Sequence, residues 1–156
     1  MLTLGRDPRG VHEMASHMED LIRTLGDPSQ RDDLKLNTLQ EISENLESLI
    51  ASPAYSLILE NLVKAFLNLL RDTNPQFIGE NNTQQLRKLV LEMFYRMPCS
   101  EQLKPYSKVI LPLMFKLVQI ENEENAIICL RIIIEFEKQY KPPFTTEVGE
   151  LDLIAF

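Results

Sequence analysis

The stretch NEENAIICLRIIIEFEKQYKPP, residues 122–143, decides the fold of this chain. It predicts one helix that ends before Pro142-Pro143, because proline has no backbone N–H with which to continue a helix. Its apolar residues cannot share one stripe about 100° wide, so neighbours must cover the helix on more than one side. These residues are Ala126, Ile127, Cys129, Leu130, Ile133, Ile134, Phe136 and Tyr140. The pattern favours a helical stack.

Five further helices are predicted before this one, from apolar spacing and from Gly, Pro, Ser or Asn at the helix ends. The spacing is clearest between Leu86 and Met97, where apolar residues recur at i, i+3, i+4, i+7, i+8 and i+11. No window alternates strictly between apolar and polar residues, so we expect an all-α chain. The helices are expected to start near residues 12, 29, 53, 82, 105 and 122.

We expect these helices to form antiparallel pairs, the second with the third and the fourth with the fifth, and the sixth to lack a partner. Pair starts lie about 40 to 53 residues apart, close to the period of HEAT and armadillo arrays. A single irregular helical bundle would give a similar spacing, and the apolar last helix favours a stack. The prediction is a HEAT-like α-solenoid segment over residues 27–143. A leader with a loose first helix (1–26) precedes it, and a divergent, disordered tail (144–156) follows it.

Charge and hydropathy exclude several classes of partner. Acidic residues outnumber basic ones by 23 to 16, whereas a duplex-binding domain needs clustered Lys and Arg, so direct nucleic-acid binding is not expected. No apolar run approaches the roughly 20 residues that cross a bilayer, and no secretory signal opens the chain, so an intracellular protein without a membrane partner is expected. Cys99 and Cys129 are expected to be free thiols, and a disulfide remains the alternative.

The sequence predicts no catalytic residue, cofactor, metal ion or small-molecule ligand. His12 and His17 are five residues apart, so they diverge by about 140° on a helix and cannot form the paired ligands of a zinc protease. Neither cysteine belongs to a CxxC pair. The acidic cluster at residues 121–125 lacks the glycine-containing turn of a calcium loop, and we interpret it as a helix start capped by Asn122.

Basic side chains are the candidates for a partner-binding site. Lys104, Lys108 and Lys116 fall on the helix expected to be second in its pair, the position that usually lines the concave face of a HEAT array. With Arg87 and Lys88 they could meet an acidic peptide. A solvated helix flank is the alternative.

The last helix is also predicted to expose apolar side chains. Ile127 and Ile134 are predicted to lie on a face that the preceding helices do not cover. An exposed apolar patch of this kind promotes self-association, so we expect the chain to oligomerise through its carboxy-terminal end.

Several segments resemble the transformation/transcription domain-associated (TRRAP) family, in its extreme amino-terminal HEAT-repeat region. The resemblance runs collinearly from about residue 27 to residue 146. The matching segments are LQEISEN (39–45), QQLRKLVLE (84–92), RMP (96–98), LKP (103–105), LMFKL (113–117), NEEN (122–125), CLRIIIE (129–135) and QYKPPFT (139–145). The tail EVGELDLIAF departs from the family pattern.

This resemblance implies a function. Members of the family are very large pseudokinases, built mostly of HEAT-type repeats, that serve as activator-contacting scaffolds of SAGA- and Tip60-type histone acetyltransferase complexes. The resemblance therefore implies a nuclear, non-enzymatic scaffold in transcription coactivation, whose partners are transcriptional activators and acetyltransferase-complex subunits. The alternatives are a HEAT-type adaptor unrelated to chromatin, and an enzyme with a site that the sequence does not reveal.

Overall fold

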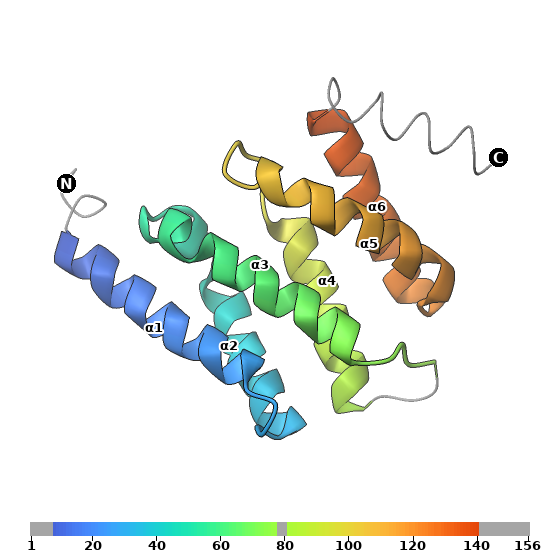
Figure 1. The fold of residues 1–156 in the computed structure, drawn as a ribbon, viewed down its shortest axis with the longest axis horizontal. Coiled ribbons are helices and arrows are strands. Elements are labelled where there is room, and N and C mark those ends of the chain that lie inside the picture. Colours follow the sequence, from blue (N-terminus) through green and yellow to red (C-terminus); the bar gives the residue numbers. More distant parts are fainter. Residues whose placement is uncertain (1–7, 78–80, 141–156) are drawn as a thin grey trace. The chain divides into compact units, whose positions relative to one another are not determined.

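A computed structural model of the chain describes residues 8–77 and 81–140 (Figure 1). All regular secondary structure in these ranges is helical, which confirms the predicted all-α class. The α-helices of the described ranges are α1 (Pro8–Gly26), α2 (Asp32–Ile50), α3 (Ala54–Asp72), α4 (Asn82–Arg96), α5 (Ser107–Ile120) and α6 (Glu123–Gln139), and a 3-10 turn, η2 (Lys104–Tyr106), leads into α5. The chain divides into two compact units, unit 1 (residues 1–97) and unit 2 (residues 98–156).

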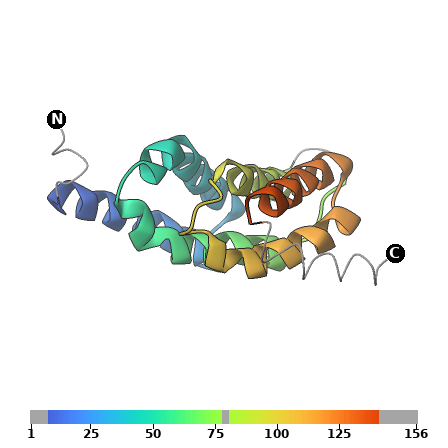
Figure 2. The same cartoon turned by 90° about the horizontal axis from the view of Figure 1, so that it is seen from above.

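The described residues of unit 1 form two helical hairpins stacked on each other. Helix α1 packs against its hairpin partner α2, and α3 packs against α4. The hairpins stack with α1 on α3 and α2 on α4, so that α1 and α3 form one layer and α2 and α4 the other (Figure 2). This repetition of antiparallel pairs agrees with the predicted solenoid of helix pairs.

The observed pairing is shifted by one helix from the predicted one. In unit 1 the first helix pairs with the second and the third with the fourth, while α2 and α3 make less contact with each other than either pair does. In unit 2 the sixth helix pairs with α5, so the expectation that it lacks a hairpin partner is wrong. A short turn brings two helix ends together but does not decide which helix faces are buried.

The core of unit 1 follows the predicted apolar stripes. Leu39, Ile42, Leu46 and Leu49 recur at intervals of three, four and three residues, so they share one face of α2, and all four are fully buried. Between α3 and α4, the rings of Phe66 and Phe94 meet edge to face with their centroids 5.4 Å apart. This geometry is one that aromatic pairs prefer, because the positive ring edge meets the negative ring face.

Three side chains set helix starts at predicted positions. The Ser52 Oγ accepts a hydrogen bond from the Ala54 backbone N–H at the start of α3. The Asn81 side chain accepts from the Gln84 N–H at the start of α4, and the Asn122 side chain accepts from the Asn125 N–H at the start of α6. Each bond satisfies one of the amides that the first helical turn leaves without a partner.

The first helix is longer and better packed than the sequence predicts. Helix α1 begins at Pro8 and buries Ala15, Met18, Ile22 and Leu25, so it is an integral helix of unit 1 rather than part of a separate leader. The predicted tail, residues 144–156, lies outside the described residues.

Candidate functional site

The five predicted basic residues lie in different units. Arg87 and Lys88 belong to α4 in unit 1, whereas Lys104 lies in η2 and Lys108 and Lys116 lie on α5 in unit 2. Lys88 and Lys104 are half-buried.

Arg87 is a structural residue in the interior of unit 1. Its side chain is 1% exposed, and Nη1 donates hydrogen bonds to the carbonyl oxygens of Leu70 (2.8 Å) and Thr73 (3.0 Å) and to Thr73 Oγ1 (2.8 Å). These acceptors lie at the carboxy end of α3, where the last carbonyls lack helical partners and the helix dipole favours a positive charge. The structure thus places Arg87 away from the surface on which an acidic peptide would bind.

The sequence does contain a signal for this burial. Residues 87, 91 and 94 are four and three positions apart, so Arg87 shares a helix face with Leu91 and Phe94. Both are buried, and Leu91 is absent from the predicted apolar stripe of this helix. Because arginine is charged, Arg87 is expected from the sequence at the surface rather than on this buried face.

Lys108 and Lys116 lie on the exposed side of α5. They are separated by eight residues, about 12 Å along the helix, with the exposed Pro112 between them. Val109 and Ile120 are exposed on adjoining positions of the same helix. This mixed basic and apolar face remains the part of the predicted basic site that is accessible in unit 2.

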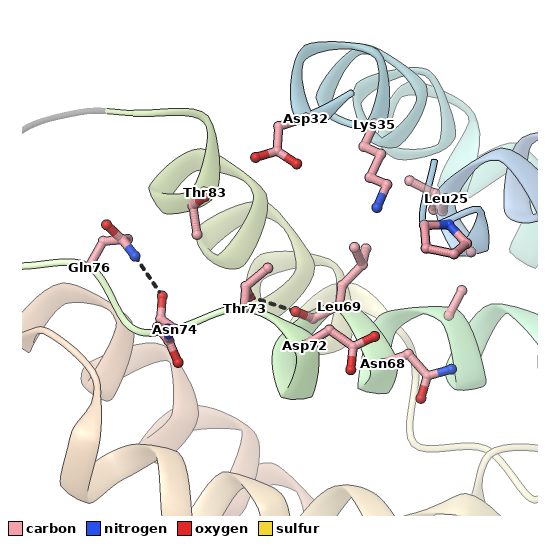
Figure 3. A pocket seen from close by; sticks show the side chains of 13 residues that line it. Leu25, Asp32, Lys35, Asn68, Leu69, Asp72, Thr73, Asn74, Gln76 and Thr83 are labelled. Atoms are coloured by element: carbon pink, nitrogen blue, oxygen red, sulfur yellow. Dashed lines mark hydrogen bonds between the residues drawn. The ribbon is translucent and has the colours of Figure 1, made fainter. Parts of the chain in front are cut away.

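Unit 1 contains a polar pocket of about 500 Å³ (Figure 3). Asp32 and Lys35 project into it from α2, and Asn68 and Asp72 line it from the end of α3. Thr83 of α4 adds a hydroxyl. Ligand pockets of this size are usually apolar with a few converging polar groups. This lining is polar and its charges have mixed signs, so the pocket does not define a particular ligand.

Helix α6 has two unlike faces in unit 2. One face, with Ile128, Cys129, Ile132 and Phe136, is buried. The opposite face carries three large apolar side chains in water, Ile127 (43% exposed), Leu130 (45%) and Ile134 (53%). The predicted exposure of Ile127 and Ile134 is confirmed, whereas self-association remains a prediction.

Neither cysteine forms a disulfide, so both are thiols as predicted. Cys129 is buried in α6, and Cys99 is half-buried. Burial raises the pKa of the Cys99 thiol, and the negative charge of Glu135 raises it further, against a smaller opposing effect of the hydrogen bond with Tyr140. A raised pKa keeps the thiol protonated and therefore weakly nucleophilic.

The acidic cluster at residues 121–125 forms the start of α6. Glu121 is buried, and its Oε1 accepts a hydrogen bond from Asn125 Nδ2 at 3.1 Å, while Asn122 caps the helix.

His17 of the rejected zinc motif lies beside Glu41 of α2, with 2.8 Å between Nε2 and Oε2. In the described ranges no three His, Cys, Asp or Glu side chains gather as a metal site would require. No described helix is long and apolar enough to cross a membrane.

Comparison with known proteins gives consistent matches. No protein-family model matches the chain. The chain is 48% identical over 127 residues to the transformation/transcription domain-associated protein of Homo sapiens, and 46% identical over 127 residues to transcription-associated protein 1 of Drosophila melanogaster. Each match covers 81% of this chain and 3% of the relative.

The chain is homologous to the TRRAP proteins. A more distant homologue, 26% identical over 131 residues, is the SAGA complex/NuA4 acetyltransferase complex subunit TRA1 of Saccharomyces cerevisiae, of which the match covers 3%. The homology confirms the family resemblance drawn from the segments. The matched region is a small part of those proteins, since the chain spans about 3% of the length of its TRRAP relatives.

Proposed function

We propose that this chain is a non-enzymatic scaffold segment that holds other proteins in a nuclear transcription-coactivator complex of the histone acetyltransferase type. The observation that carries the proposal is the 48% identity over 127 residues to a transcription-associated relative. A relative that is named as a subunit of the SAGA and NuA4 acetyltransferase complexes supports the acetyltransferase setting. The partners in this proposal are transcriptional activators and subunits of the complex.

The fold supports a scaffold role. Stacked helix pairs present long faces whose exposed side chains can vary without disturbing the buried stripes. In unit 2 the exposed side of α5 offers Lys108 and Lys116 beside Val109 and Ile120, a combination that suits a partner with acidic and apolar side chains. Lys104 stands just before this helix and extends the basic character of the surface.

The test is co-purification from nuclear extract with the tagged 156-residue chain as bait. We expect acetyltransferase-complex subunits among the captured proteins. A double substitution, Lys108→Glu with Lys116→Glu, should lower their recovery several-fold because it reverses the charge of the exposed face of α5. The matched control is Lys64→Glu, an exposed lysine of α3 in unit 1.

Two results would contradict the proposal. Capture of cytoskeletal or transport proteins without acetyltransferase subunits would indicate a HEAT-type adaptor unrelated to chromatin. Recovery that is equal for the double variant and for Lys64→Glu would remove the basic face of α5 from the interaction.

A further inference from the structure

The exposed face of α6 has an ordered arrangement of charge and apolar surface. Glu123, Ile127, Leu130 and Ile134 recur at intervals of four, three and four residues, so they follow one stripe along the helix. Lys138 continues the stripe one turn beyond Ile134. The stripe therefore reads acid, three apolar residues, base, over about 22 Å of helix.

This order is complementary to itself when reversed. Ile127 and Ile134 are equally far from the midpoint between Leu130 and Arg131, and so are Glu123 and Lys138. If a second copy of α6 runs antiparallel across this midpoint, Ile127 of one copy meets Ile134 of the other at both ends of the contact. Each Glu123 then meets a Lys138 of opposite charge. A two-fold symmetric interface needs a surface that matches itself in this way.

We propose that the chain forms a two-fold symmetric dimer through antiparallel packing of the α6 stripe against the same stripe of a second copy. The apolar centre of the stripe stabilises the dimer, because three side chains that are 43–53% exposed in one copy become buried in the interface. The terminal charges fix direction and register, as flanking charges do in paired helices. A parallel arrangement would instead place Glu123 against Glu123 and Lys138 against Lys138.

The charged side chains at the two ends of the stripe, Glu123 and Lys138, are accessible to a second copy. Glu123 is exposed at the first turn of α6. Lys138 lies 3.8 Å from Glu135 of its own helix, with 65% of its side chain exposed. A long contact on the surface holds a flexible lysine weakly, so Lys138 can turn toward a second copy. This inference concerns assembly of the chain and stands apart from the proposed scaffold function.

The first test measures the mass of the full chain by light scattering and sedimentation over a range of concentrations. We expect a reversible monomer–dimer equilibrium. Ile127→Glu with Ile134→Glu should abolish the dimer and leave the helical circular dichroism and the melting transition in place, because both side chains lie outside the core. Leu57→Glu, at an exposed leucine of α3 in unit 1, is the matched control and should dimerise normally.

The second test addresses the register. Glu123→Lys and Lys138→Glu should each raise the dissociation constant of the dimer about tenfold, because each replaces two attractions per dimer by two repulsions. The double variant carries the reversed pair and should regain most of the affinity.

Three outcomes would overturn the proposal. The unmodified chain could stay monomeric at all concentrations, which would mean that another part of the chain or a different protein covers the stripe. The dimer could survive the double glutamate substitution. The two charge reversals could also weaken the dimer additively, which would exclude the antiparallel register.

Discussion

The two units of this chain hold their helices together in different ways. In unit 1 two arginines of α4 reach neighbouring helices, Arg87 to the end of α3 and Arg96 to α2. In the described part of unit 2, α5 and α6 form one helix pair, and the Tyr140 hydroxyl donates to the Ser100 carbonyl oxygen at 2.7 Å beside a largely apolar contact. Directional bonds therefore position helix α4, whereas α6 is positioned mainly by the shape of its buried face.

The largest expected effect tests the buried arginine. Arg87→Ala removes three hydrogen bonds and leaves the acceptors at the end of α3 unsatisfied, so the free energy of unfolding should fall by about 3–5 kcal/mol. Urea denaturation followed by circular dichroism measures this. Arg71→Ala, at an exposed arginine of α3, is the control and should change stability by less than about 0.5 kcal/mol. Equal effects of the two substitutions would refute the special role of Arg87.

The second prediction concerns the arginine that links α4 to α2. Arg96 Nη1 donates to Ser43 Oγ at 2.6 Å, and Nη2 donates to the Ser43 carbonyl oxygen at 2.7 Å. Arg96→Ala should lower the free energy of unfolding by about 1–2 kcal/mol, because these charge-assisted bonds are partly open to water. The control Arg23→Ala removes only an exposed ion pair with Asp20 on α1, and the same denaturation should detect almost no change.

The Arg96 link also has a dependence on pH. The hydrogen bond from Arg96 lowers the pKa of the Glu47 carboxyl below its usual value of 4.5. A lowered pKa in the folded state gives stability that is present above pH 4.5 and is lost as the pH falls through the folded-state pKa. Acid titration of the Arg96→Ala variant should therefore show a shallower loss of stability below pH 4.5 than the unmodified chain. Parallel titration curves would contradict this assignment.

The third prediction tests the directional bond of unit 2. Tyr140→Phe removes the hydroxyl that donates to Ser100 and that also bonds weakly to the Cys99 thiol, but it keeps the ring, which meets Phe136 edge to face at 5.6 Å. The free energy of unfolding should fall by about 1 kcal/mol, the usual net value of one neutral hydrogen bond. Tyr106→Phe, at a half-buried tyrosine of the same unit, is the matched control. A loss of several kcal/mol would mean that unit 2 depends on directional bonds as unit 1 does.

The smallest expected effect comes from Tyr55 in α3 of unit 1. The hydroxyl is buried and has no hydrogen-bond partner among the described residues, so Tyr55→Phe should be neutral or slightly stabilising. Burial raises the pKa of this phenol from 10 to about 12. The unmodified chain should therefore lose stability as the pH rises from about 10 to 12, since the unfolded phenol ionises first. The Phe variant should lose less over this range, and Tyr95→Phe, at an exposed tyrosine of α4, should not differ from the parent.

The sequence predicts the helices of this fold better than their partners. Apolar spacing and capping side chains such as Asn81 and Asn122 act within a few residues, so the helix positions follow from local chemistry. Pairing depends on which stripes bury each other across tens of residues, and a short turn does not encode this. The shifted pairing of the hairpins has this cause.

The sequence likewise predicts one feature of the candidate surfaces but not the other. Exposure of Ile127 and Ile134 follows from one helix whose apolar residues exceed a single stripe, so the sequence predicts it. The interior place of Arg87 depends on the end of another helix, Leu70 to Thr73, whose unpaired carbonyls exist only in the folded unit. From sequence alone, a positively charged residue is expected at the surface unless carbonyl acceptors that pair with it in the interior are known.

The link from Arg96 to Ser43 has a consequence for the order of folding. It joins residues 53 apart in the sequence and connects the α1–α2 hairpin to the α3–α4 hairpin. Contacts of such separation form after local helical turns, since closing a long loop costs entropy before the contact forms. Loss of this link should therefore speed unfolding while leaving the refolding rate nearly unchanged. We therefore expect Arg96 to determine how long the two hairpins stay packed together rather than how fast they assemble.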